Sequence, residues 1–104
     1  MRLSKGQIVN SRSRTTPCTS PYSLVAADFT GNGQMGLAVA NFGDNNLSVF
    51  LGNGDGTFTP ASSSPVAVGQ SPIAIVAGDF TGSGRTGLAT ANLGDSTISV
   101  LLQQ

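Results

Sequence analysis

Residues 21–52 read PYSLVAADFTGNGQMGLAVANFGDNNLSVFLG, and residues 72–103 repeat the pattern as PIAIVAGDFTGSGRTGLATANLGDSTISVLLQ. Aligned without a gap at an offset of 51 residues, the two stretches are identical at 18 of 32 positions. A period of about 50 residues is typical of repeat architectures, in which one unit cannot bury its own apolar surface and needs stacked neighbours. The sequence therefore predicts two similar units that require further partners.

The composition favours strands. The chain of 104 residues contains 14 glycines, no histidine and no tryptophan, and all five of its acidic residues are aspartate. Glu is absent, Lys is nearly absent and other long polar residues that favour helices are few, whereas Val, Thr and Ser are common, so we predict an all-β fold with tight turns. Without His or Glu, acid-base chemistry would depend on Asp alone, and no two aspartates have a recognisable catalytic spacing. We therefore expect no enzyme.

Three short apolar runs, separated by Gly, Asn, Asp and Ser, recur in each unit and predict three strands. They are residues 24–29, 37–41 and 47–51 in the first unit, and 75–80, 88–92 and 98–102 in the second. After the first unit we expect a fourth strand, either at 57–61 or at 66–68. The intervening GNGDG at 52–56 resembles a phosphate-binding loop only superficially, because no Lys-Ser/Thr pair and no helix follow, and we expect a hairpin turn.

Both faces of these strands are apolar or small. Leu47, Val49 and Leu51 alternate with Ser48 and Phe50. A sheet with one face in water would carry polar residues at every second position. The pattern therefore predicts small sheets that are covered on both sides by face-to-face stacking.

The N-terminal arm differs from the rest of the chain in charge. It contains Arg2, Lys5, Arg12 and Arg14, but no aromatic platform or recognition helix, so we expect a solvated or strand-forming arm and no nucleic-acid partner. Cys18 is the one cysteine, which excludes an internal disulfide, and no histidine is present to activate it. The sequence shows no secretory signal and no run of about 20 apolar residues, so we expect no membrane insertion.

The segment GQIV at 6–9 precedes the first unit much as GTFT at 56–59 precedes the second. We therefore divide the chain into an arm at 1–20 with an outer strand that completes a neighbouring unit, a first unit at 21–70 and a three-stranded second unit at 71–104. Unpaired strand edges invite association with another chain. A head-to-tail contact of this kind closes a ring when the rotation between units fits.

The motif DFTGNG at 28–33, with GLAVAN at 36–41 and LGNGDGTF at 51–58, resembles the FG-GAP/VCBS repeat of integrin-α-type β-propellers. The second unit matches through DFTGSG at 79–84 and GLATAN at 87–92. The resemblance covers nearly everything after residue 20 and implies four-stranded blades around a central axis, usually about six to eight of them. With two blades per chain, the implied partner is a second copy of this chain, in a trimer or tetramer that forms a closed six- or eight-bladed β-propeller.

Members of this family often hold calcium in a loop of the form D-x-[DN]-x-[DN]-G-x-x-D. At the matching positions this chain has Asp28, Thr30 and Asn32 in the first unit and Asp79, Thr81 and Ser83 in the second. Glycine replaces the closing Asp, so each loop keeps one carboxylate, whereas calcium prefers several. We therefore expect no cofactor. The alternative role for the two aspartates is to accept hydrogen bonds from their own loop amides and hold the turn.

Two classes of function stay open. The first is a non-enzymatic binding and assembly module, in which repeated clefts between blades recognise glycans or protein loops by avidity. Candidate contact residues are Asn41, Asp44, Asn45, Asn92 and Asp95, which are otherwise ordinary turn residues. The second is a structural fragment of a longer FG-GAP/VCBS propeller without independent activity. The compartment is not indicated by the sequence, although the resemblance implies a mostly extracellular family.

Overall fold

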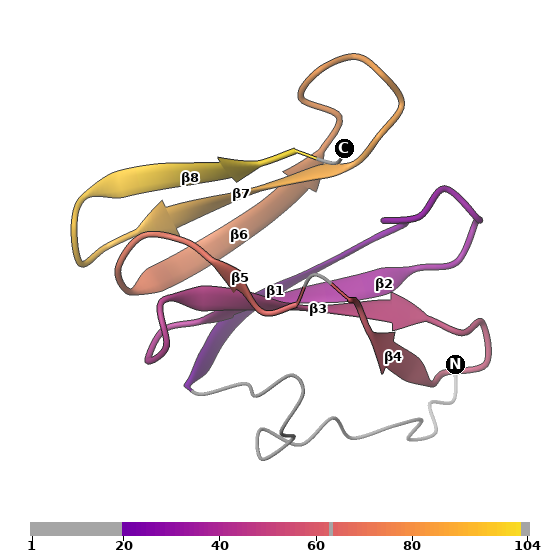
Figure 1. Ribbon diagram of the computed structural model, residues 1–104, viewed down its shortest axis with the longest axis horizontal. Helices are drawn as coiled ribbons and strands as arrows, with labels where there is room; N and C mark the ends of the chain where they lie inside the picture. The colour runs from indigo at the N-terminus through magenta and orange to yellow at the C-terminus, as the bar shows by residue number, and fades with distance from the viewer. Residues whose placement is uncertain (1–19, 63, 103–104) are drawn as a thin grey trace, which may run out of the picture.

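A computed structural model describes residues 20–62 and 64–102 (Figure 1). Within these residues all regular structure is β, in two antiparallel sheets, which confirms the predicted all-β class. Sheet A contains β1 (Pro21–Ala27), β2 (Gly36–Asn41), β3 (Asn46–Gly52), β4 (Phe58–Pro60) and β5 (Val66–Ala67). Sheet B contains β6 (Pro72–Gly78), β7 (Gly87–Asn92) and β8 (Thr97–Leu101). No helix in the described part of the chain could cross a membrane.

The three strands predicted for each unit are present, but both bounds of the first strand are corrected. It begins at Pro21 and Pro72, three residues before the predicted start. The first strands were expected to run through residues 29 and 80, but they end at Ala27 and Gly78. They end earlier because the next residue, Asp28 or Asp79, turns the chain by accepting hydrogen bonds from the backbone amides that follow it.

Both alternatives for the fourth strand of the first unit are realised, on different parts of β3. β4 pairs with the C-terminal end of β3, where Thr59 lies opposite Leu51, and β5 pairs with its N-terminal end, where Val66 lies opposite Leu47. The hairpin predicted at residues 52–56 joins β3 to β4, with the amide of Asn53 donating to the carbonyl of Thr57 at 3.0 Å. β3 is therefore paired along both of its edges.

The two sheets pack face to face, with sheet B above sheet A in Figure 1. β6 makes the most extensive inter-sheet contacts, with β1 and β2. The core between the sheets is formed by apolar residues of both units: Phe29, Ala38, Ala40, Leu47, Val49, Ile75 and Leu88. Among residues 20–62 and 64–102 the apolar core is shared by the two sheets, so each depends on the other for the burial that stabilises it.

The N-terminal arm predicted at 1–20, including its four cations and Cys18, lies outside the described residues apart from Ser20. The division of the chain at residues 21–70 and 71–104 stays a prediction.

Candidate interaction surface

The two sheets contact each other through unlike faces. We call the front face of each sheet the one that carries Leu47 and Val49 in sheet A and their equivalents Ile98 and Val100 in sheet B; the opposite side is the back face. Strand register places Ala38 beside Val49 on the front of sheet A. The core cluster joins these residues to Leu88 of sheet B, which pairs with Leu101 and therefore lies on the back face, opposite to Val100. The front of sheet A thus packs against the back of sheet B.

Equivalent residues on the two front faces differ sharply in exposure. Leu47 is 0% exposed and Val49 is 8% exposed, because sheet B covers them. Their equivalents Ile98 and Val100, on the front of sheet B, are 74% and 55% exposed. The front face of sheet B is therefore an apolar surface without a cover in the described structure.

The aromatic residue after the first strand repeats this contrast. An added Cβ on Gly36 would lie 3.0 Å from the ring of Phe29, and one on Gly87 would lie 3.1 Å from the ring of Phe80, so each ring packs over the glycine that begins the second strand. Yet Phe29 is buried and Phe80 is exposed. The local architecture of the front face is the same in both units, and only the covering neighbour differs.

Two of the predicted ligand contacts, Asn41 and Asn92, are instead buried at the ends of β2 and β7. The side-chain amide of Asn41 donates to Ser48 Oγ at 2.8 Å, and that of Asn92 donates to Ser99 Oγ at 2.9 Å. Each bond crosses to the next strand of the same sheet. These amides thus hold the second and third strands together and do not lie at the surface.

The two buried asparagines differ in one bond. Thr90 Oγ1 donates to Asn92 Oδ1 at 3.0 Å, whereas Asn41 Oδ1 is buried without a hydrogen-bond partner in the described structure. Residue 39, which is equivalent to Thr90, is Val39 and carries no hydroxyl. The apolar side chain at this position explains the unsatisfied acceptor in the first unit.

The other predicted contacts lie in the turns after β2 and β7, and two of them hold the segment that links the sheets. Asn45 Oδ1 accepts a hydrogen bond from the amide of Ser71 at 2.9 Å, and Asp95 Oδ2 accepts one from the amide of Gln70 at 3.2 Å. The side chain of Asp44 is exposed. Sequence reasoning missed this tethering role because Asn and Asp in a turn look the same whether they bond locally or to a distant segment.

Hydroxyl groups lower the pKa of two turn aspartates. Thr97 Oγ1 donates to the carboxylate of Asp95 at 2.6 Å, and Thr57 Oγ1 donates to Asp55 at 2.5 Å. These side-chain hydrogen bonds are the main reason that the pKa of each aspartate lies below its usual value. Both aspartates therefore stay ionised and fix the conformation of their turns.

The loops expected at the calcium positions close on their own backbone. Asp28 Oδ2 accepts the amide of Gly33 at 2.7 Å and Oδ1 accepts that of Gly31 at 2.9 Å, while Asp79 Oδ2 accepts the amide of Gly84 at 2.7 Å. These bonds, those from Gly33 and Gly84 above all, lower the pKa of both aspartates. The alternative role for Asp28 and Asp79, holding the turn, is confirmed.

The remaining donors of these loops do not fit a calcium ion. Asn32 Oδ1 accepts the amide of Gln34 at 3.0 Å, and the hydroxyl groups of Thr81 and Ser83 bond each other at 2.8 Å. The side chain of Thr30 is exposed, and only its backbone amide contacts Asp28. Over residues 20–62 and 64–102 no group of three or more His, Cys, Asp or Glu side chains gathers at one place. Calcium prefers several carboxylates, whereas here one carboxylate per loop is already occupied by N–H donors.

Two small antiparallel sheets, which share the order of their first three strands and pack face to face, define a repeat protein of stacked β-units. The chain belongs to the FG-GAP-like repeat family, whose family model matches residues 28–90. This confirms the FG-GAP resemblance and indicates a β-propeller-type fragment. No curated protein and no solved structure matches the chain.

Proposed function

We propose that the chain is a non-enzymatic assembly module whose copies stack head to tail, with the front face of sheet B on the back face of sheet A of the next copy. One observation carries this proposal: residues that sheet B buries on sheet A are exposed at the equivalent places on sheet B itself. The back faces mirror this along their first strands, since Leu24 in β1 is 61% exposed and its equivalent Ile75 in β6 is 6% exposed, whereas Phe50 on the back of β3 is buried. The exposed front of sheet B and the exposed β1 side of the back of sheet A thus correspond to the two halves of the contact already made inside the chain.

The energetics favour an assembly that depends on protein concentration. The front face of sheet B offers five large exposed apolar side chains: Val76, Phe80, Ile98, Val100 and Leu102. Fully burying one such side chain contributes about 1.5–3 kcal/mol, and association costs roughly 4–15 kcal/mol in lost freedom of motion. Gain and cost are of the same order, so the mutual fit of the faces decides the stability of the assembly.

Two sheets per chain lead us to propose a trimer or tetramer, which would form a closed β-propeller of six or eight sheets. The ligands that we propose for such a ring are glycans or protein loops bound at its repeated turns, where Asp44 is exposed. We propose no cofactor, no nucleic-acid partner and no membrane insertion, and an extracellular location in keeping with the repeat family. A glycan array probed with the assembled protein tests the sugar ligand, and no binding to any glycan would remove it.

Light scattering on the purified chain, with calcium and with a chelator, tests the assembly. We expect one discrete mass of three or four chains, unchanged by either addition. Ile98→Asp should give a smaller species, because it places a charge in the stacked face, whereas Gln34→Glu adds the same charge in an exposed loop and should leave the mass unchanged. A folded monomer at every concentration would contradict the proposal.

The alternative is that the chain is a fragment of a longer FG-GAP/VCBS propeller without independent activity, and the same exposed face supports it. In that case the next repeat of the longer protein covers Ile98 and Val100. The isolated chain would then aggregate or unfold without reaching a discrete mass, which separates the two candidates in the same experiment.

A further inference from the structure

The outer edge of sheet B, formed by β8, is unpaired in the described part of the chain. In sheet A, β3 pairs with β2 along one edge and with β4 and β5 along the other. In sheet B, β8 pairs with β7 only, as far as the described residues extend. An unpaired strand edge presents free amides and carbonyls that accept an added strand.

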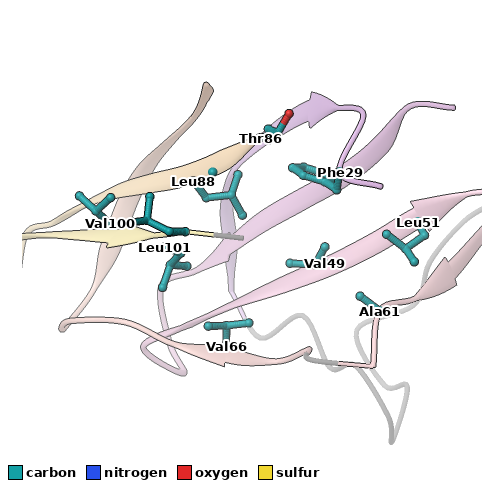
Figure 2. Close-up of a pocket in the computed structure, with 11 residues that line it drawn as sticks. Phe29, Val49, Leu51, Ala61, Val66, Thr86, Leu88, Val100 and Leu101 are labelled. Atoms are coloured by element: carbon teal, nitrogen blue, oxygen red, sulfur yellow. The ribbon is translucent and has the colours of Figure 1, made fainter. Parts of the chain in front are cut away.

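An apolar cavity lies between the sheets beside this edge. Its volume is about 580 Å3, and Figure 2 shows Val49 and Leu51 of β3 on one side and Leu88 of β7 and Leu101 of β8 on the other. The labelled residues around it are apolar apart from Thr86. The edge of β8 therefore offers both backbone pairing and an unfilled place for an apolar side chain.

The pairing of β4 in sheet A shows how a strand would fit there. Thr59 lies opposite Leu51 and Phe58 lies opposite Gly52. Alternate residues point to opposite sides of a sheet, so Thr59 belongs to the front face with Leu51, and Phe58 belongs to the back face. On sheet B the back face looks towards sheet A, so the equivalent of Phe58 would point to the side of the cavity.

The N-terminal arm contains a segment with this pattern, because GQIV at 6–9 matches GTFT at 56–59. We propose that residues 6–9 of a second copy add to β8 as an antiparallel strand, with Val9 opposite Leu102 and Ile8 in the cavity. This inference rests on the proposed head-to-tail stacking. The arm also carries four cations, whereas the described part of the chain has five aspartates and Arg85, so the two attract each other weakly in physiological salt.

The path of the chain indicates that the arm comes from another copy. In the first unit β4 and then β5 pair with the outer edge of sheet A, and residues 68–71 lead from β5 into β6, the first strand of the following sheet. In the sequence the arm likewise precedes β1, so by this analogy the sheet that it would complete is the one preceding sheet A. The chain's own sheet B lies on the other side, against the front of sheet A.

Engineered cysteines test the pairing in the full chain. In a Cys18→Ser background we combine Val9→Cys with Leu102→Cys. Facing residues of antiparallel strands have Cα atoms about 4.5–5.5 Å apart, within the range of a disulfide. On mild oxidation we expect a ladder of reducible intermolecular species that ends at the mass found by light scattering. The matched control combines Val9→Cys with Leu93→Cys, an exposed residue that does not belong to β8, and should give little cross-linking.

The possible outcomes of this experiment separate strand addition from head-to-tail stacking. An intramolecular disulfide would show that the chain's own arm occupies the edge, and cross-linking no stronger than in the control would show that the arm does not; either result overturns the inference. If the oligomer persists without the specific cross-link, stacking stands and strand addition is wrong, whereas a monomer without the cross-link contradicts both. Circular dichroism of the reduced variants confirms that they fold, and adding Ile8→Asp should reduce the specific cross-link several-fold.

Discussion

The first three strands of sheet A and the three strands of sheet B are similar in sequence and have the same order, but their surroundings are very different. Leu47 on the front of sheet A is fully buried, while Ile98 at the equivalent place on sheet B is 74% exposed. Hydrogen bonds within each unit form the sheet in both cases. The comparison shows that the repeat specifies the shape of its unit locally but obtains its core only from a neighbour.

The largest effect on stability is expected when Leu47, the buried residue of the pair Leu47 and Ile98, is truncated. Leu47→Ala should lower the free energy of unfolding by about 2–5 kcal/mol, because it leaves a cavity between the sheets. Ile98→Ala removes a branched side chain from the exposed front face of sheet B and should cost well under half as much in dilute protein. Urea denaturation of both variants measures the difference.

Protein concentration sharpens the same comparison. If copies stack as proposed, the cost of Ile98→Ala should rise towards that of Leu47→Ala as the protein is concentrated, because the stacked neighbour then buries residue 98. A cost of Ile98→Ala that stays small and constant over a hundredfold range of concentration would show that the front face of sheet B has no cover in solution.

The second prediction exchanges the residues that make the two buried asparagines different. Thr90→Val should destabilise the chain by about 1–3 kcal/mol, because it leaves Asn92 Oδ1 buried without a donor. Val39→Thr should stabilise it by about 0.5–1.5 kcal/mol by giving Asn41 Oδ1 the bond that it lacks. The two changes are nearly isosteric, so each serves as the steric control for the other. Equal signs in thermal denaturation would contradict this explanation.

The sequence predicted most of the fold, because the signals for strands and turns are local. Alternating apolar residues located the strands, and Gly-rich segments located the turns. The strand ends at Ala27 and Gly78 were missed, because Asp28 and Asp79 were assigned to strands although their carboxylates begin the loops. The N-terminal strand and the assembly stay predictions.

The candidate site was harder to predict than the fold. Asn41 and Asn92 follow an apolar run and precede Gly-Asp, which is typical of exposed turn residues, yet both are buried. One signal was available: each is followed, seven residues later, by a serine, Ser48 or Ser99, and these are the residues that they bond. That spacing has meaning only once the strand register is known.

The third prediction concerns the tether between the turn after β2 and the segment that links the sheets. Asn45 and its equivalent Ser96 both have positive φ, 58° and 56°, but only Asn45 bonds the linking segment in the described structure. Alanine at either place carries the strain of the left-handed conformation, about 1–2 kcal/mol. Asn45→Ala should therefore cost about 0.5–1.5 kcal/mol more than Ser96→Ala, the value of the lost bond to Ser71. Equal unfolding midpoints for the two variants would show that the tether contributes nothing.

The smallest effect is expected in acid, where the two aspartate loops can be compared. Asp28 accepts amides from Thr30, Gly31 and Gly33, whereas Asp79 accepts those of Ser83 and Gly84. These bonds lower the pKa of both carboxylates from 3.8 in the folded chain. Their contribution to stability is therefore present above the unfolded pKa, near pH 4, and is lost as the pH falls through the folded pKa.

Urea denaturation from pH 7 down to pH 2 measures this acid dependence. Because the chain contains no histidine, the unfolding midpoint should stay nearly constant from pH 7 to pH 5 and decline below pH 4. Asp28→Asn and Asp79→Asn should each remove part of the decline, and by similar amounts, because backbone amides of both loops lower the pKa of the carboxylate that they bond. Asp44→Asn removes the same charge from an exposed turn and controls for the change in net charge. If this control flattens the decline as much as Asp28→Asn does, acid acts through the overall charge and the hydrogen bonds of the two loops have no energetic consequence.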